Sequence, residues 1–443
     1  MNNISYPLNS LKQGQWFKLI CGASFQHLPA IRNLTLAYTL AGADCIDVAA
    51  DPAVVAAARE ALKAAADLGA EAKQRGFGFR GLPLLMVSLN DGEDPHFRKA
   101  EFDATACPPE CPRPCESICP AEAIIFEGSN GFSGIVEQKC YGCGRCLPVC
   151  PSNLIFARSY VSTPEAVAPL VLQTGVDALE IHTQVGRLAD FERLWKAIVP
   201  WMNQLKLIAI SCPDGDGLIA YLRSLYDVIK PLPCPLIWQT DGRQMSGDIG
   251  AGTTHAAIKL GQKVLSAELP GYVQLAGGTN NYTAIKLKAM GLLNPDWDHQ
   301  DGELETRQYL NQSLIPSAYK YIAGIAFGSY ARVLLSPVLD EIEKIEMNST
   351  DSFSKDNWER TVGADPSPTS PLPVEGLSNS PFPSREGGWG VRFSELANSI
   401  NTTSTQQVLF RPVLLEDKPE LLWQAVALAH GLVSQIKPSN FVV

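Results

Sequence analysis

Residues 107–120 read C-P-P-E-C-P-R-P-C-E-S-I-C-P, and residues 140–151 read C-Y-G-C-G-R-C-L-P-V-C-P. The second run has the spacing C-x2-C-x2-C-x3-C-P, which ligates iron–sulfur clusters in bacterial two-cluster ferredoxins. Three closely spaced thiolates bind one cluster, and the fourth cysteine, followed by proline, reaches the other cluster. The first run ends in the same way at Cys119 and Pro120, but its earlier cysteines are four residues apart rather than three. Together the two runs predict a ferredoxin-like module.

The crossed ligation of two-cluster ferredoxins assigns each cysteine to one of two sites. The first site is expected to bind a cluster through Cys107, Cys111, Cys115 and Cys150. The second site is expected to use Cys119, Cys140, Cys143 and Cys146. We expect a [4Fe–4S] cluster at both sites. A [3Fe–4S] cluster is the alternative at the first site, because its cysteine spacing is longer.

Two other kinds of cysteine site are disfavoured. Zinc ribbons pair one C-x2-C with a distant second pair and lack both the third cysteine and the C-x3-C-P ending. Disulfides require an oxidising compartment, and nothing in the sequence indicates one. Eight cysteines within residues 107–150 therefore favour iron–sulfur clusters over zinc or disulfides.

The composition favours a globular protein of two or three domains. The chain has 443 residues, of which 46% are hydrophobic and 19% charged, with a net charge of −10. That charge argues against a nucleic-acid or anionic-membrane surface. The first residues, MNNISYPLNSLKQGQW, lack the basic and apolar regions of a secretory signal, and no apolar run is long enough to span a bilayer. We therefore expect a soluble, cytoplasmic protein with no transmembrane segment.

Outside the cysteine runs, short apolar strands alternate with helical patterns, as in parallel βα units. Three strands are expected before the cysteine runs, and five after them. They cover residues 17–21, 44–49, 83–89, 178–182, 205–210, 235–239, 272–276 and 321–327. This count predicts a (β/α)8 barrel with the ferredoxin-like module inserted after strand three. An open doubly wound sheet is the alternative, although no Gly-rich dinucleotide fingerprint follows strand one.

The pattern divides the chain into five parts. Residues 347–404 are rich in Ser, Pro, Asn, Thr and Gly, which predicts a disordered, low-complexity insertion. A helix near residues 418–436 is expected to pack on the barrel. The predicted parts are barrel strands one to three (1–105), the cluster module (106–160), barrel strands four to eight (161–346), the insertion (347–404) and the C-terminal helix segment (405–443).

A second site is expected where the barrel strands end, because active sites of such barrels lie at that face. The loops after strands seven and eight often bind phosphate through backbone N–H groups. Candidates for this role are Gly277, Gly278, Gly328 and Ser329. Flavin or a sugar phosphate would suit such a site, although flavin is not favoured, and the same glycines would also suit simple tight turns. His182 and Arg187 are interpreted as a helix cap and a surface charge rather than as anion ligands.

Several stretches resemble the cyanobacterial light-dependent period (LdpA) family. They are WFKLICGASFQHLPAIRNL, the paired cysteine runs, DGRQMSGDIGAGTTHAAIKLGQKVL, YVQLAGGTNNYT and FGSYARVLLSP. The resemblance covers about residues 15–345 and excludes the insertion. It implies an iron–sulfur protein that senses cellular redox state and passes light information to the circadian clock, near its input kinase and oscillator proteins. The resemblance implies no catalytic residues, so these remain unknown.

Three classes of function follow from these observations. A non-enzymatic redox sensor is favoured by the resemblance and by two clusters whose potential can follow a cellular pool. The alternative is a ferredoxin-linked reductase that uses the barrel face as a flavin or substrate site, so enzymatic activity is left open. A quinone or ferredoxin pool, or another electron donor, would then be a partner. A simple electron carrier is disfavoured, because the module alone would suffice for it.

Overall fold

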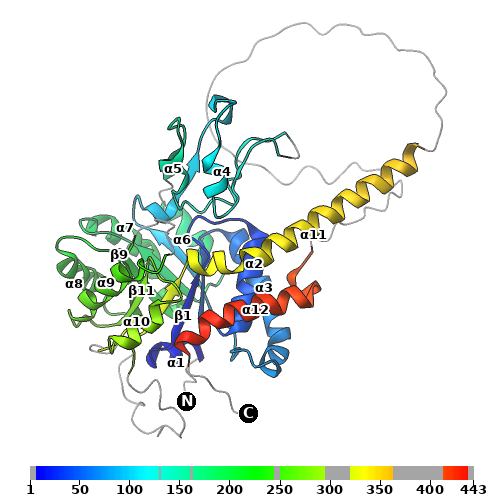
Figure 1. The fold of residues 1–443 in the computed structure, drawn as a ribbon. Coiled ribbons are helices and arrows are strands. Elements are labelled where there is room, and N and C mark those ends of the chain that lie inside the picture. The colour runs from blue at the N-terminus through cyan, green and yellow to red at the C-terminus, as the bar shows by residue number, and fades with distance from the viewer. Residues whose placement is uncertain are drawn as a thin grey trace, which may run out of the picture. The chain divides into compact units, whose positions relative to one another are not determined.

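The structure is a computed structural model that describes residues 6–128, 131–159, 163–243, 250–294, 320–362 and 413–437. Eight parallel strands form a closed barrel, in which β1 pairs with both β2 and β12 (Figure 1). The predicted (β/α)8 barrel is confirmed, and the alternative of an open sheet is wrong because the barrel has no strand edge. Its strands are β1 (Trp16–Ile20), β2 (Cys45–Ala49), β3 (Leu84–Asn90), β8 (Ala178–His182), β9 (Leu207–Pro213), β10 (Leu236–Asp241), β11 (Tyr272–Ala276) and β12 (Gly324–Phe327).

Helices follow the strands and cover the outside of the barrel, α11 only with its first part up to Ile342 (Figure 1). They are α2 (Leu28–Ala41), α3 (Pro52–Gln74), α6 (Pro164–Leu172), α7 (Leu188–Ile198), α8 (Leu218–Ile229), α9 (Thr254–Leu265), α10 (Thr283–Ala289) and α11 (Ser329–Val362). A short helix, α1 (Tyr6–Lys12), precedes the first strand. The helix α12 (Pro419–Val433) packs against α2.

Local sequence signals explain the helix boundaries. At the start of α3 the Asp51 carboxylate accepts hydrogen bonds from the N–H groups of Ala53 and Val54, and Pro52 occupies the first helical position. Helix α2 ends at Gly42, whose φ of 97° suits glycine. A Cβ at Gly42 would also lie 2.3 Å from the carbonyl oxygen of Gly78, so only glycine fits there.

The side chains inside the barrel change from apolar to polar along the barrel axis. Apolar side chains fill the end at which the strands begin, where Trp16, Leu84, Ile237 and Tyr272 belong to one buried cluster. Two residues further along the strands, the buried side chains are polar. They are Lys18, Asp47, Glu180, Gln239 and Gln274. Since inward-facing residues recur every second position, each strand contributes to both layers. The polar layer therefore lies towards the end that carries active sites in this fold.

The cluster module is inserted between β3 and α6, whereas β3 and β8 remain neighbours in the barrel. It contains two short antiparallel pairs: β4 (Arg98–Glu101) with β7 (Phe156–Ser159), and β5 (Ile124–Ile125) with β6 (Gly134–Ile135). The helices α4 (Pro114–Ile118) and α5 (Cys146–Val149) contact each other. The sequence patterns did not indicate β4. The charged strand R-K-A-E lacks the apolar run by which strands were identified.

The predicted boundary at residue 346 differs from the structure, because α11 continues to Val362. The helical stretch after Pro337 contains no Gly or Pro before Gly363, so nothing local stops it. The chain forms two compact units, residues 1–342 with 414–443 and residues 343–413. The rest of the proposed insertion, residues 363–404, lies outside the described residues.

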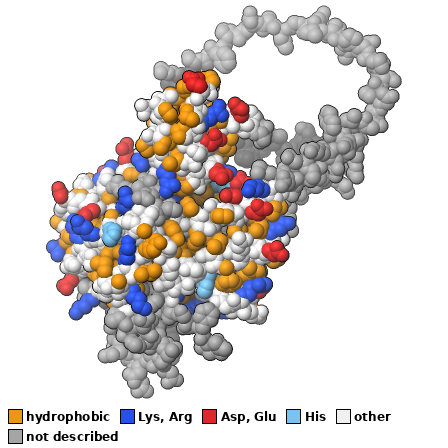
Figure 2. Space-filling view, viewed as in Figure 1, with side chains coloured by type: hydrophobic (Ala, Val, Ile, Leu, Met, Phe, Trp, Pro, Cys, Tyr) orange, Lys and Arg blue, Asp and Glu red, His pale blue; other side chains and the backbone are white. Residues whose placement is uncertain are grey.

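The surface carries both kinds of charge. On the face shown in Figure 2, basic and acidic side chains are interspersed, with apolar side chains between them. Among the described residues, none of the helices is long and apolar enough to cross a membrane.

Residues near the C-terminus complete the end of the barrel where the strands begin. The Lys437 ammonium lies 2.5 Å from the Asp44 carboxylate, which is fully buried and also accepts the N–H of Phe17 at 2.8 Å. Burial raises the pKa of Asp44, and Lys437 opposes that shift. Elsewhere, Arg32 in the first turns of α2 makes a two-bond contact with Glu416. The C-terminal segment is therefore held to the barrel by ion pairs as well as by apolar packing.

Replacing Lys437 with Met should destabilise the protein, because the substitution leaves the buried Asp44 carboxylate without its cation. Removing one partner of a buried pair costs about 3 kcal/mol or more. Denaturant unfolding of the anaerobic protein, followed by circular dichroism, measures this. Lys418→Met is the matched control, since Lys418 is exposed in the same segment. Equal stability of the two variants would show that the ion pair contributes nothing.

Candidate functional site

The four cysteines predicted for the first cluster lie together in the module. Cys107 interacts electrostatically with both Cys111 and Cys150. Cys115 interacts electrostatically with both Cys107 and Cys150. Cys150, which follows α5, therefore lies beside cysteines of the first run. The assignment of these residues as ligands stays a prediction.

The four cysteines predicted for the second cluster line one cavity. Cys119, Cys140, Cys143 and Cys146 surround about 350 Å³ of empty space, open solvent included. Cys146 interacts electrostatically with the other three. Cys119 therefore lies beside the cysteines of the second run. The two groups match the crossed pattern of two-cluster ferredoxins.

Backbone N–H groups are directed at several of these sulfur atoms. The donor–sulfur pairs are Ala100 to Cys140 (3.4 Å), Ala123 to Cys119 (3.3 Å) and Leu154 to Cys150 (3.4 Å). Burial opposes ionisation of Cys150, but the surrounding N–H groups hold its pKa below the usual value. Such hydrogen bonds stabilise thiolate charge and tune the potential of a ligated cluster.

The chemistry of the cysteine groups fits metal binding. All twelve cysteines of the chain are free thiols. Burial, together with the neighbouring thiols, raises the pKa of Cys146 to about 12. Four adjacent thiols of this kind ionise together only when a cation compensates their charge. The donor set and its grouping therefore fit clusters of iron and sulfide, which bind thiolates.

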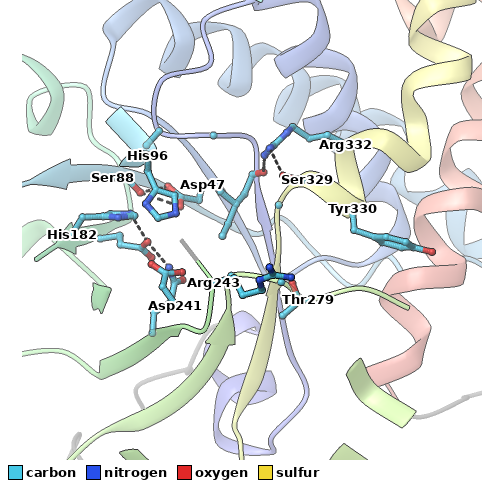
Figure 3. A pocket seen from close by; sticks show the side chains of 18 residues that line it. Asp47, Ser88, His96, His182, Asp241, Arg243, Thr279, Ser329, Tyr330 and Arg332 are labelled. Carbon is cyan, nitrogen blue, oxygen red and sulfur yellow. Dashed lines mark hydrogen bonds and ion pairs between the residues drawn. The ribbon is translucent and has the colours of Figure 1, made fainter. Parts of the chain in front are cut away.

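A second cavity opens at the end of the barrel where the strands stop. It has about 750 Å³ of empty space, open solvent included, and is lined by residues in or just after all the barrel strands except β9. His96, His182 and Asp241 lie on one side of it, and Arg332, Ser329 and Tyr330 lie on the other (Figure 3). One side of the cavity therefore carries imidazoles and carboxylates, and the other carries a guanidinium and a helix start.

A buried charge network forms the floor of this cavity. Lys18 pairs with Glu180 and lies 3.0 Å from Asp47 and 3.1 Å from the Gln239 side chain. Burial alone would lower the pKa of Lys18, but the two carboxylates raise it above its usual value. Burial would raise the pKa of Glu180, yet Lys18 and His182 hold it below the usual value. Lys18 is thus a buried cation held by two buried anions.

The network continues below and above Lys18. The Gln239 amide donates to Glu180 at 2.6 Å, the Gln274 amide donates to Gln239 at 2.6 Å, and the Trp16 indole donates to Gln274 at 2.6 Å. Above this layer, the Ser88 hydroxyl donates to Asp47 at 2.8 Å. These bonds link the polar layer to the apolar end of the barrel and fix its side chains.

The interpretation of His182 as a helix cap or surface charge is wrong. His182 belongs to β8, its side chain is 6% exposed, and its Nε2 lies 2.9 Å from Glu180. Burial would lower the pKa of His182, but Glu180 and Asp94 raise it to about 9. Arg187 immediately precedes α7 without capping it through its side chain, and it lies 3.9 Å from Asp91.

The four residues predicted to bind phosphate all line the barrel cavity. Gly277 and Gly278 have φ values of 65° and 100°, and a Cβ on either would collide with the backbone of the loop after β10. These two glycines are therefore required by the turn itself. A Cβ on Gly328 would make only ordinary contacts, and Ser329 opens α11. A phosphate role for the four residues remains a prediction.

One contact joins the cluster module to the barrel cavity. Tyr141, between Cys140 and Cys143, lines the cavity of the second cysteine group and is 4% exposed. The Arg332 guanidinium, which lines the barrel cavity, lies 4.1 Å from the centre of the Tyr141 ring. Arg332 also donates to the carbonyl oxygens at the end of β1 and just after it. The two cavities are thus linked by a stacked cation and ring.

The loop after β1 holds the module through further bonds. The Lys99 ammonium donates to the Gln26 side chain at 2.8 Å, and the Gln26 N–H donates to the carbonyl oxygen of Gln138 at 3.2 Å. Lys99 belongs to β4, whose next residue, Ala100, donates to the Cys140 sulfur. The barrel mouth and the second cysteine group therefore share their supporting residues.

Sequence inspection missed several residues of the cavity. Lys18 and Asp47 lie inside strands that read as nearly continuous apolar runs. Each occupies the third position of its strand, where one polar residue interrupts the apolar pattern. That interruption at matching positions was the available signal. Arg332 and Tyr141 had no comparable signal, because their contact depends on the inserted module.

These features define an iron–sulfur protein whose ferredoxin-type module is inserted into a (β/α)8 barrel with a polar, ligand-sized cavity. The chain belongs to the Light dependent period A family. It is 49% identical over 338 residues to "Light dependent period A" of Synechococcus elongatus, covering 76% of this chain and 86% of that protein. The LdpA Fe-S cluster-binding domain matches residues 107–161, and the Light dependent period A C-terminal domain matches residues 170–366.

Other similarities are shorter. An iron–sulfur protein of Rhodospirillum rubrum is 41% identical over 61 residues, 13% of this chain and 31% of that protein. The formate dehydrogenase iron-sulfur subunit of Haemophilus influenzae is 40% identical over 45 residues, 10% of this chain and 14% of that protein. The apo homocysteine methyltransferase MmuM from Escherichia coli aligns with a TM-score of 0.26 and 14% identity, over 58% of this chain and 91% of that chain. So low a score supports no conclusion.

Replacing Lys18 with Met should strongly destabilise the barrel, because Asp47 and Glu180 would then be buried without a cation. The expected loss is about 3–5 kcal/mol. The double variant Lys18→Met/Glu180→Gln should regain part of this loss, since it removes one buried negative charge. Denaturant unfolding measures both variants, with Lys259→Met on the exposed side of α9 as the control. A double variant no more stable than Lys18→Met alone would contradict this account of the network.

Proposed function

We propose that this protein is a cytoplasmic iron–sulfur redox sensor that couples the redox and light state of the cell to the circadian clock. Membership of the Light dependent period A family and the grouped cysteines support this proposal. Its partners would be the clock input kinase and oscillator proteins that the family resemblance implies. The observation that carries the proposal is the stacking of Arg332 on Tyr141, between the second cysteine group and the barrel mouth.

This contact offers a way for the redox state of a cluster to change the protein surface. Reduction of a cluster adds one negative charge to the module. At an effective dielectric constant of about 20, the interaction energy of two unit charges about 10 Å apart is about 1–2 kcal/mol. A change of about 1.4 kcal/mol alters a binding constant tenfold. Because Arg332 holds the end of β1 and Ser329, a shift of its guanidinium would reach both loops.

We infer two cubane-type clusters in the assembled protein. The second cysteine group has the regular spacing and lines an inward cavity, which favours a stable [4Fe–4S] cluster. The first group has the longer spacing, and Cys107 and Cys111 in it are only partly buried. We expect the first cluster to be lost first in air, through a three-iron form.

A ferredoxin-linked reductase is the second candidate function. The barrel cavity favours it, because Lys18, Glu180 and His182 place buried, charged groups where enzymes of this fold bind substrates. Electrons would come from a donor such as a quinone or ferredoxin pool and pass through the clusters. A flavin bound by the loops after β11 and β12 is not favoured, because Gly277 and Gly278 already serve the turn.

Metal content tests the clusters directly. Protein purified without oxygen should contain about eight iron and eight sulfide per chain, as two [4Fe–4S] clusters require. Cys143→Ala should remove the second cluster, and Cys111→Ala should remove the first. Each variant should therefore contain about half of the wild-type iron. Cys234→Ala is the control, since Cys234 is buried outside the module. Zinc without inorganic sulfide in the wild-type protein would overturn the cluster assignment.

Redox-dependent binding tests the sensor. We expect the affinity for the clock input kinase or oscillator proteins to differ several-fold between dithionite-reduced and oxidised protein. Arg332→Gln should reduce that difference without changing the iron content, because it breaks the contact with Tyr141. Arg223→Gln, an exposed site on α8, is the control. Equal affinities in the two redox states would count against the sensor.

The protein purified without oxygen also distinguishes a reductase from a sensor, through its bound cofactors. A yellow extract with flavin absorbance, lost in Gly328→Asp, would favour a reductase. This variant is suitable because a side chain at Gly328 meets only ordinary contacts, so the fold should tolerate it.

A further inference from the structure

Three potential metal ligands meet at the edge of the barrel cavity. His182 ends β8, while Asp94 and His96 lie in the short segment between β3 and β4. One ligand atom from each residue lies within 4.8 Å of the other two. The His96 Nδ1 lies 2.7 Å from Asp94 Oδ1, and the His182 Nδ1 lies 3.8 Å from the same oxygen. The two imidazoles therefore converge on one carboxylate.

The three side chains are shielded from solvent. Their exposed fractions are 6% for His182, 15% for Asp94 and 17% for His96. Exposed acidic groups often gather without binding an ion, but these are mostly buried and include two imidazoles from separate segments. His96 and His182 both line the cavity and lie close together in Figure 3. A ligand entering the cavity would therefore reach them.

The residues around His182 orient its ring in the way that is usual for a metal-ligating histidine. Metal-ligating histidines donate their other ring N–H to a carboxylate, which fixes the orientation of the ring. The His182 Nε2 lies 2.9 Å from Glu180, which leaves Nδ1 directed at Asp94. Glu180 is in turn fixed by Lys18 and by the Gln239 amide. The buried charge network thus fixes His182 from behind.

We propose that Asp94, His96 and His182 bind a divalent first-row transition metal ion at the barrel mouth. Two imidazoles and one carboxylate form a ligand set that suits such ions and leaves coordination positions open. The cavity is adjacent to these positions, and Arg243 also lines it. A small anionic molecule could therefore bind the ion while contacting the guanidinium. The site goes beyond the proposed function, since a sensor or a reductase could use it.

One short segment connects the site to the second cysteine group. His96 precedes β4, and within β4 the N–H of Ala100 donates to the sulfur of Cys140. The same short segment therefore carries an ion ligand and supports a cluster ligand. Metal binding at the barrel mouth and the redox state of that cluster would consequently influence each other.

Cobalt binding tests the site in the complete, cluster-containing protein. Cobalt(II) is the probe because elemental analysis separates it from the iron of the clusters. After anaerobic equilibrium dialysis, wild-type protein should bind about one cobalt per chain. Asp94→Asn and His96→Ala should each weaken binding at least tenfold, since even supporting residues around a metal contribute about 10–100-fold. His255→Ala and Asp190→Asn are controls at exposed or half-buried positions on α9 and α7, and should bind as wild type does.

Two checks keep the result interpretable. The iron content and melting temperature of each variant show whether it is folded. Cobalt X-ray absorption of the wild-type protein gives a readout independent of any variant, and should show nitrogen and oxygen ligands with the signature of imidazole. Wild-type protein that binds no cobalt, equal binding in all variants, or sulfur ligands around cobalt would each overturn the proposal.

Discussion

The barrel interior depends on the pairing of Lys18 with Glu180 and Asp47. All three side chains are nearly inaccessible to solvent, so each charge must be compensated within the protein. The pairing ties β1 to β2 and β8, and the Gln239 amide adds β10. Because these strands lie on different sides of the barrel, the network fixes their mutual positions. It also fixes His182, and thereby the polar edge of the cavity.

The general architecture was predictable because it follows from the alternation of strands and helices along the chain and from the spacing of the cysteines. The strand positions in the barrel were expected within a few residues, since each βα unit repeats the same alternation of a short apolar strand and a helical pattern. The cysteine runs were also readable, because cluster ligation imposes its spacing on the chain. Both signals are local and need no knowledge of tertiary contacts.

The site at the barrel mouth was less readable for a physical reason. Lys18 and Asp47 are polar residues in apolar strands, and only the closed barrel shows that they face each other. His96 lies in a segment without a regular pattern, and its closeness to His182 depends on how the inserted module leaves β3. The contact of Tyr141 with Arg332 joins residues almost two hundred positions apart. Such pairings arise from topology and cannot be read from sequence periodicity.

The insertion between neighbouring strands has a consequence for the order in which the protein matures. On the ribosome, residues 107–150 emerge before β8 to β12, and β1 must wait for β12 before the barrel closes. The contacts within the module span far shorter sequence separations than those that close the barrel. The cysteines can therefore be gathered, and supplied with iron and sulfide, while the barrel is still open. Closure of the barrel would then place Arg332 against Tyr141 and seal a cluster already assembled.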